Sequence, residues 1–193
     1  YFHAAAAKYE LKFEPRSDRV LFLDVYAMQA EYHMKKHGTT QVQIAASAAK
    51  NHAHGALNPK AQYRKSMTVA EVLEDIPIVG PFTRSMCSPI SDGAAALLVC
   101  SKSYLDRLAP VVAGRAVKVK GCAASSGRYR DLSEPSLTRF AAQKAYQQAG
   151  ISPKDIDVLE LHDSTSFCEL YQLEMLGICE EGQGGPFVES GET

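Results

Sequence analysis

The sequence predicts an α/β protein with a partly parallel sheet. Three apolar runs of strand length, at 93–101, 117–124 and 156–161, are interspersed with segments that have helical spacing. The run GAAALLVCS at 93–101 is apolar without alternation, which is typical of a strand buried on both faces. Strands that alternate with helices favour parallel pairing, and ligands of such sheets bind beyond the carboxyl ends of the strands.

Helix-start and helix-stop residues place the predicted helices. Thr40 and Gln43 fit a capping box, so a helix is expected to begin there and to extend to about His54. Gly38 and Gly150 are expected to end helices, because glycine readily adopts the left-handed conformation of a helix C-terminus. Further helices are predicted at 25–36, 69–73, 137–148 and 165–176.

The two ends of the chain carry weaker signals. The first 20 residues show no clear period and are expected to be irregular, and the Gly-rich end is expected to form turns. The chain begins at Tyr1 rather than at a methionine, which is typical of a fragment.

Length, composition and net charge limit the classes of protein to which this chain can belong. The 193 residues suffice for one sizeable core, and 46% hydrophobic with 22% charged residues excludes wholesale disorder. A net charge of -1 gives no reason to expect a nucleic-acid partner. No apolar run approaches the roughly 20 residues of a membrane span, so a soluble protein is expected. Five cysteines without a CxxC pair indicate a reducing compartment.

His162 is the strongest candidate for chemistry. It follows the predicted strand at 156–161 and precedes a helix, where a sheet presents side chains to a crevice. An imidazole there can donate a hydrogen bond to a developing oxyanion or hold a water for proton transfer. The alternative is a histidine that only caps the helix or bonds a neighbouring strand. Asp163 either orients that ring or caps the helix, and capping is favoured.

Three other features have structural interpretations as well as functional ones. The turn at 88–93 leads into a small-residue run and is interpreted as structural. His52 and His54 lack the i, i+4 spacing of a zinc enzyme, so solvated histidines are favoured and no metal site is expected. Cys87 as a nucleophile is disfavoured, since no histidine is close in sequence.

Three stretches resemble the thiolases of the sterol-carrier-protein type. These are HMKKHGTTQVQIAASAAKNHAHGALNPKAQYRK at 33–65, CSPISDGAAALLV at 87–99 and DIDVLELHDSTSFCELYQLEMLGICEEGQGG at 155–185. The resemblance implies a thiolase-like layered α-β-α-β-α fold that is incomplete in this chain. It divides the chain into a mainly loop domain at 1–84, the end of the N-terminal half at 85–112 and the first part of the C-terminal half at 113–193.

The resemblance also assigns roles to residues. His162 matches the histidine of the family's His-Asp-Cys-Phe motif, which lies in the oxyanion hole, and Ser88 matches a serine that touches the pantetheine arm of coenzyme A. Ser164 and Thr165 replace the family's Cys and Phe, so with Asp163 they are expected to border the substrate. The family's nucleophilic cysteine would precede residue 1, and its Gly-His-Pro histidine and Cys-Gly-Gly cysteine would follow residue 193.

The implied function is that of a thiolase-type acyl-CoA acyltransferase of lipid metabolism, which cleaves or forms the carbon-carbon bond of a 3-oxoacyl-CoA. Coenzyme A is then a substrate, and no cofactor is expected. One alternative is a thiolase-like retro-aldolase of sterol side-chain degradation, working with a small partner protein that has a zinc ribbon and an OB-fold. Another is a non-catalytic, thiolase-like structural subunit. A homodimer is expected, in the cytoplasm or, in a eukaryote, the peroxisome.

Overall fold

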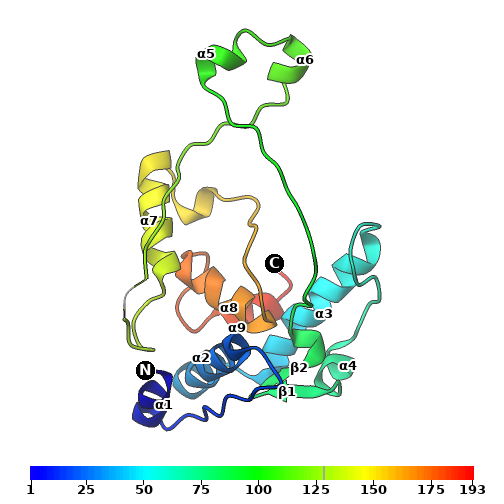
Figure 1. Ribbon diagram of the computed structural model, residues 1–193, viewed down its shortest axis with the longest axis vertical. Helices are drawn as coiled ribbons and strands as arrows, with labels where there is room; N and C mark the ends of the chain where they lie inside the picture. The colour runs from blue at the N-terminus through cyan, green and yellow to red at the C-terminus, as the bar shows by residue number, and fades with distance from the viewer. Residues whose placement is uncertain (128) are drawn as a thin grey trace.

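The protein is described by a computed structural model in which residues 1–127 and 129–193 are defined (Figure 1). The α-helices are α1 (Phe2–Tyr9), α2 (Leu21–His37), α3 (Gln41–Leu57), α4 (Val69–Leu73), α5 (Lys102–Leu105), α6 (Pro110–Ala113), α7 (Leu137–Ala149), α8 (Ser166–Met175) and α9 (Gly184–Glu189). The short remaining elements are β1 (Pro77–Val79), β2 (Phe82–Thr83) and the 3-10 helices η1 (Arg84–Met86) and η2 (Pro153–Asp155). None of the helices in the described ranges combines the length and hydropathy that crossing a bilayer requires.

The core lies where α2, α3, α8 and α9 pack together, with α4 and the β1–β2 hairpin beside them (Figure 1). Alanines on the inner faces of α2 and α3 leave room for larger side chains from α8, because a small side chain lets helix backbones approach. Ile44 and Leu170 are completely buried in this core. Burying such a side chain stabilises the fold by about 1.5–3 kcal/mol.

The helix signals near Gly38 are confirmed. Gly38 ends α2 in the left-handed conformation, with φ of 77°, and its N–H bonds the carbonyl of Met34. Thr40 and Gln43 form both hydrogen bonds of the capping box that begins α3. Gly150 likewise ends α7 with φ of 66°.

Both ends of the chain are more ordered than the sequence predicts. The first 20 residues contain α1, whose four consecutive alanines are strong helix formers and whose Phe2 packs on Phe13. The Gly-rich end contains α9 rather than turns alone. Gly184 is needed there, since a Cβ at that position would lie 2.3 Å from the carbonyl oxygen of Leu170.

The three runs predicted as strands form no sheet with one another in the described part of the chain. There the β-pairing consists of the antiparallel β1–β2 hairpin and an isolated bridge between Cys87 and Thr165. Figure 1 shows the run at 93–101 leading to α5 and the run at 117–124 returning alongside α7. Leu97 and Val158 are 92% and 80% exposed. A strand is buried on both faces only when neighbouring elements cover it. These runs form separate extended segments, so their apolar side chains remain exposed.

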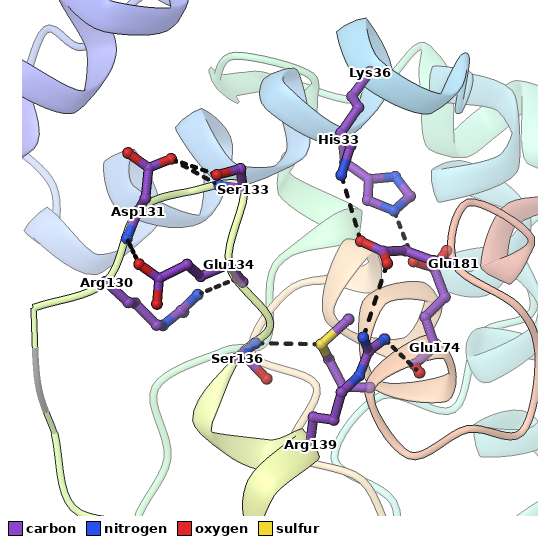
Figure 2. A network of polar contacts seen from close by, with 11 residues as sticks. His33, Lys36, Arg130, Asp131, Ser133, Glu134, Ser136, Arg139, Glu174 and Glu181 are labelled. Atoms are coloured by element: carbon purple, nitrogen blue, oxygen red, sulfur yellow. Dashed lines mark hydrogen bonds and ion pairs between the residues drawn. The ribbon is translucent and has the colours of Figure 1, made fainter.

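A buried polar pair joins α2 to α8. His33 Nε2 lies 2.9 Å from Glu174 Oε2, His33 Nδ1 lies 2.9 Å from Thr39 Oγ1, and Glu174 Oε1 accepts the N–H of Gly184. Both side chains of the pair are buried, and Figure 2 shows the ring of His33 facing Glu174. Burial favours the neutral carboxyl, but these hydrogen bonds and the charge of His33 hold the pKa of Glu174 below its usual value.

Truncating Glu174 should destabilise the fold severely. Glu174→Ala would leave His33 and the Gly184 N–H without their partner, at a cost of about 3–5 kcal/mol in the free energy of unfolding. Because the folded carboxyl has a lowered pKa, its contribution is present above the usual glutamate pKa of about 4.3 and is lost as the pH falls through the folded value. Denaturant unfolding of wild type and Glu174→Ala measures the loss, and the same experiment on wild type and Glu174→Gln at several pH values measures the pH dependence, with Glu180→Ala at an exposed position as control. A stability gap between wild type and Glu174→Gln that widens as the medium becomes acidic would contradict the assignment.

Candidate functional site

Hydrogen bonds between two segments that are distant in sequence, 87–88 and 164–165, bring the predicted site residues together. Cys87 and Thr165 form the isolated antiparallel bridge. Beside it, the N–H of Ser88 donates to the carbonyl of Ser164 at 3.1 Å, and the Ser88 hydroxyl donates to the same oxygen at 3.0 Å. The turn at 88–93, interpreted from sequence as structural, therefore begins beside the motif at 162–165.

His162 is exposed at the end of the 156–161 arm. Its Nε2 lies 2.8 Å from the hydroxyl oxygen of Ser164. The direction of this hydrogen bond depends on which ring nitrogen carries the proton. An exposed imidazole held at one nitrogen keeps the other nitrogen free to meet a substrate.

The remaining motif residues have different environments. Thr165 is completely buried, its hydroxyl lies 3.4 Å from Cys168 Sγ, and it is the N-cap residue of α8. The expectation that Asp163 caps this helix is therefore wrong. Asp163 is exposed and faces a cavity instead.

That cavity has a volume of about 230 Å³ and lies between α3, the turn after η1 and the start of α8. Its polar lining includes Asn51, His52, Tyr63, Ser88, Asp163 and Ser166. The Ser166 hydroxyl is buried and has no hydrogen-bond partner among residues 1–127 and 129–193, and such a group gains free energy when a bound molecule or water supplies one. The site can therefore receive a ligand with polar atoms.

The α3 wall of this cavity was not predicted from the sequence. His52 lies in α3, within the helix predicted from Thr40 to about His54, and it is half-buried rather than solvated. Its ring stacks on Tyr63 with ring centroids 6.4 Å apart. Ala48, His52 and Gly55 recur at intervals of four and three residues, which place them on one face of a helix. That spacing is the signal that could have identified this wall.

Metal binding at the histidines gains no support. In residues 1–127 and 129–193, no group of three His, Cys, Asp or Glu side chains could hold a metal ion. His54, which the sequence pairs with His52, is exposed to solvent.

A buried carboxylate fixes α8 against α3 one turn after the motif. Glu169 is 6% exposed and accepts hydrogen bonds from the Ser47 hydroxyl at 2.5 Å and from Asn51 Nδ2 at 3.2 Å. Lys50 forms an ion pair with it. Because a buried charge is stable only when it is paired and hydrogen-bonded, these contacts favour one position of α8.

The two cysteines beside the motif are poor nucleophiles. Burial, with the proximity of Cys168, raises the pKa of the Cys87 thiol to about 11. Burial also raises the pKa of Cys168 despite its hydrogen bond to Thr165. Since the thiolate is the reactive form, neither thiol is activated near neutral pH.

Comparison with known proteins identifies the relatives of this chain. Residues 122–193 match the family model described as thiolase C-terminal domain-like. The chain is 37% identical over 178 residues to an acetyl-CoA acetyltransferase of Methanothermobacter thermautotrophicus, an alignment covering 90% of this chain and 46% of that protein. It is 33% identical to benzoylsuccinyl-CoA thiolase subunit BbsB of Thauera aromatica, covering 87% of this chain and 44% of the relative.

A further relative is sterol carrier protein 2 of Bos taurus, 36% identical over 83% of this chain and 31% of that protein. The chain thus spans less than half the length of these three curated relatives. Among solved structures, the Ltp2-ChsH2(DUF35) aldolase superposes with a TM-score of 0.70 at 24% identity, over 88% of this chain and 46% of that chain. That superposition shows the fold, which is the incomplete layered fold implied by the sequence resemblance.

Alkylation of the cysteines tests the electrostatics of the site. Cys87 should react with iodoacetamide on the order of 100-fold more slowly than an ordinary thiol at pH 7.5, because its raised pKa leaves little thiolate. The exposed Cys100 and Cys122 serve as internal controls. Peptide mapping by mass spectrometry follows each site, and alkylation of Cys87 ahead of both controls would overturn this description.

Proposed function

This chain belongs to the thiolase superfamily, and we propose on that premise that the protein is a thiolase-type acyl-CoA acyltransferase that cleaves or forms the carbon-carbon bond of a 3-oxoacyl-CoA. The observation that carries the proposal is His162. Its ring is solvent-accessible at the end of the 156–161 arm and is hydrogen-bonded to Ser164, whose carbonyl accepts from Ser88.

In this proposal His162 donates a hydrogen bond to the substrate oxygen on which negative charge develops. A donor aimed at such an oxyanion lowers the barrier because it needs little reorganisation during the reaction. The resemblance assigns the nucleophilic cysteine and the second acid-base groups to motifs other than those found in residues 1–193. The raised pKa values of Cys87 and Cys168 support this division, since neither thiol is suited to replace the nucleophile.

The acyl-CoA would enter beside the hydrogen bonds that join Ser88 to Ser164. Ser88 and Asp163 line the cavity, and Ser164 adjoins it through its bond to Ser88, so all three are proposed to border the substrate. Thr165 is proposed to shape this wall from behind, because its side chain is buried. Coenzyme A acts as a substrate, and no cofactor or metal is proposed.

The domain division follows the family. The match over 122–193 to a C-terminal domain supports a second half that begins at 113, after a mainly loop domain at 1–84 and the end of the first half at 85–112. We further propose a homodimer in the cytoplasm or, in a eukaryote, the peroxisome.

A second candidate is a thiolase-like retro-aldolase working with a partner protein that has a zinc ribbon and an OB-fold. The observation that favours it is the replacement of the family's Cys and Phe by Ser164 and Thr165, which changes the chemistry beside the substrate. The two candidates differ in products. Thiolysis consumes coenzyme A and yields two thioesters, whereas retro-aldol cleavage releases a carbonyl compound without consuming coenzyme A.

Substitution of His162 tests the proposal. In thiolysis of a 3-oxoacyl-CoA, His162→Ala should lower kcat/KM by more than about tenfold, equivalent to about 1.4 kcal/mol of barrier. His54→Ala is the matched control, because His54 is an exposed histidine away from the cavity. A parallel assay on a 3-hydroxyacyl-CoA, which has the β-hydroxyl that retro-aldol cleavage requires, separates that cleavage from thiolysis by its products. An active wild type with a smaller loss on His162→Ala would rule out the oxyanion role, and a wild type inactive in both reactions would favour a structural subunit.

A further inference from the structure

We propose that Ser88 and Ser164 are positioning residues that fix the imidazole of His162, so that Ser88 acts on the rate of the reaction rather than mainly on coenzyme A binding. The inference deepens the proposed function, because it assigns a task to two residues that the family resemblance places only at the substrate wall.

The first step is the immobilisation of the Ser164 backbone. Its carbonyl accepts two hydrogen bonds from Ser88, at 3.1 Å from the N–H and at 3.0 Å from the hydroxyl. The adjacent bridge between Cys87 and Thr165 adds a second restraint on the same segment. Since the hydroxyl proton of Ser88 is used in this way, that hydroxyl can accept a hydrogen bond from a ligand but has no proton left to donate.

The second step is the restraint of the ring. An exposed histidine at the end of an irregular arm would otherwise sample several rotamers. The 2.8 Å contact between Ser164 Oγ and His162 Nε2 restrains the ring to one orientation. If the hydroxyl donates to Nε2, the ring offers Nδ1–H to the substrate. Only that arrangement leaves a neutral His162 with an N–H for the substrate oxygen, because a ring that gives its Nε2–H to Ser164 presents an unprotonated Nδ1.

Serine rather than cysteine at position 164 strengthens the contact with His162. The family pattern has a cysteine at the position of Ser164, and a thiol is a weak hydrogen-bond donor and acceptor. A hydroxyl forms the shorter and stronger bond, so the replacement strengthens the restraint on His162. Misplacing a catalytic group by about 1 Å can reduce a rate by 10²-fold, which makes such a restraint measurable.

Kinetics of serine variants provide the first test. Ser164→Ala should lower kcat by about 10- to 100-fold while KM for coenzyme A stays within about twofold. Ser164→Thr, which retains a hydroxyl, should recover most of the loss. Ser88→Ala should lower kcat by a smaller factor, because the Ser88 N–H still holds Ser164, and should leave KM unchanged. Ser103→Ala is the control, since Ser103 is exposed in the distant helix α5.

A double-mutant cycle separates this inference from the proposed function. Ser164→Ala should cause no further loss in a His162→Ala background, because it acts through that ring. If His162→Ala impairs activity but Ser164→Ala raises only KM, or if the two losses multiply, the positioning role is overturned and the proposed function stands. If His162→Ala is harmless, the proposed oxyanion role fails instead.

Nitrogen NMR of the histidine side chains provides a readout that needs no activity. Ser164→Ala should move the Nε2 resonance of His162 and change its tautomer balance, while the resonances of His54 stay in place. Unchanged His162 resonances in a folded Ser164→Ala protein would overturn the positioning contact whatever the kinetics show.

Discussion

Two buried carboxylates on α8 determine the position of this helix and of the segment at 162–165 that precedes it. Glu169 and Glu174 are both buried, and each would be costly without its partners. Ser47 on α3 and His33 on α2 supply those partners from two different helices. A slide or rotation of α8 would break both sets of contacts together, so the helix has one favourable position. The segment at 162–165, which leads directly into α8, is placed by the same contacts.

A second layer of charges surrounds this buried arrangement. Figure 2 shows Lys36 from α2 and Arg139 from α7 converging on Glu181, at 3.5 and 3.8 Å, while Arg139 also reaches the carbonyl of Glu174. These pairs are partly exposed, so each contributes at most about 1 kcal/mol. They link the segment after α8 to α2 and α7 but contribute little to the free energy of unfolding.

Local signals could be predicted from the sequence, whereas contacts between distant segments could not. The capping box of Thr40 and the glycine that ends α2 depend on neighbours within four residues, and both were predicted. The bond from Ser88 to Ser164 joins residues 76 positions apart and has no periodic signature. The run at 93–101 was predicted as a buried strand because of its composition, but its burial depends on neighbouring strands that the run does not itself specify.

The departure from the family motif has consequences that differ at its two positions. Thr165, in place of a phenylalanine, directs its hydroxyl to Cys168 inside the protein, and its side chain is buried. Ser164, in place of a cysteine, directs its hydroxyl to the ring of His162 at the surface. The replacement at 164 therefore acts on the exposed ring of His162, whereas the replacement at 165 lies in the interior. Because the backbone carbonyl of Ser164 also accepts from Ser88, this single residue connects the lining of the cavity to the ring of His162.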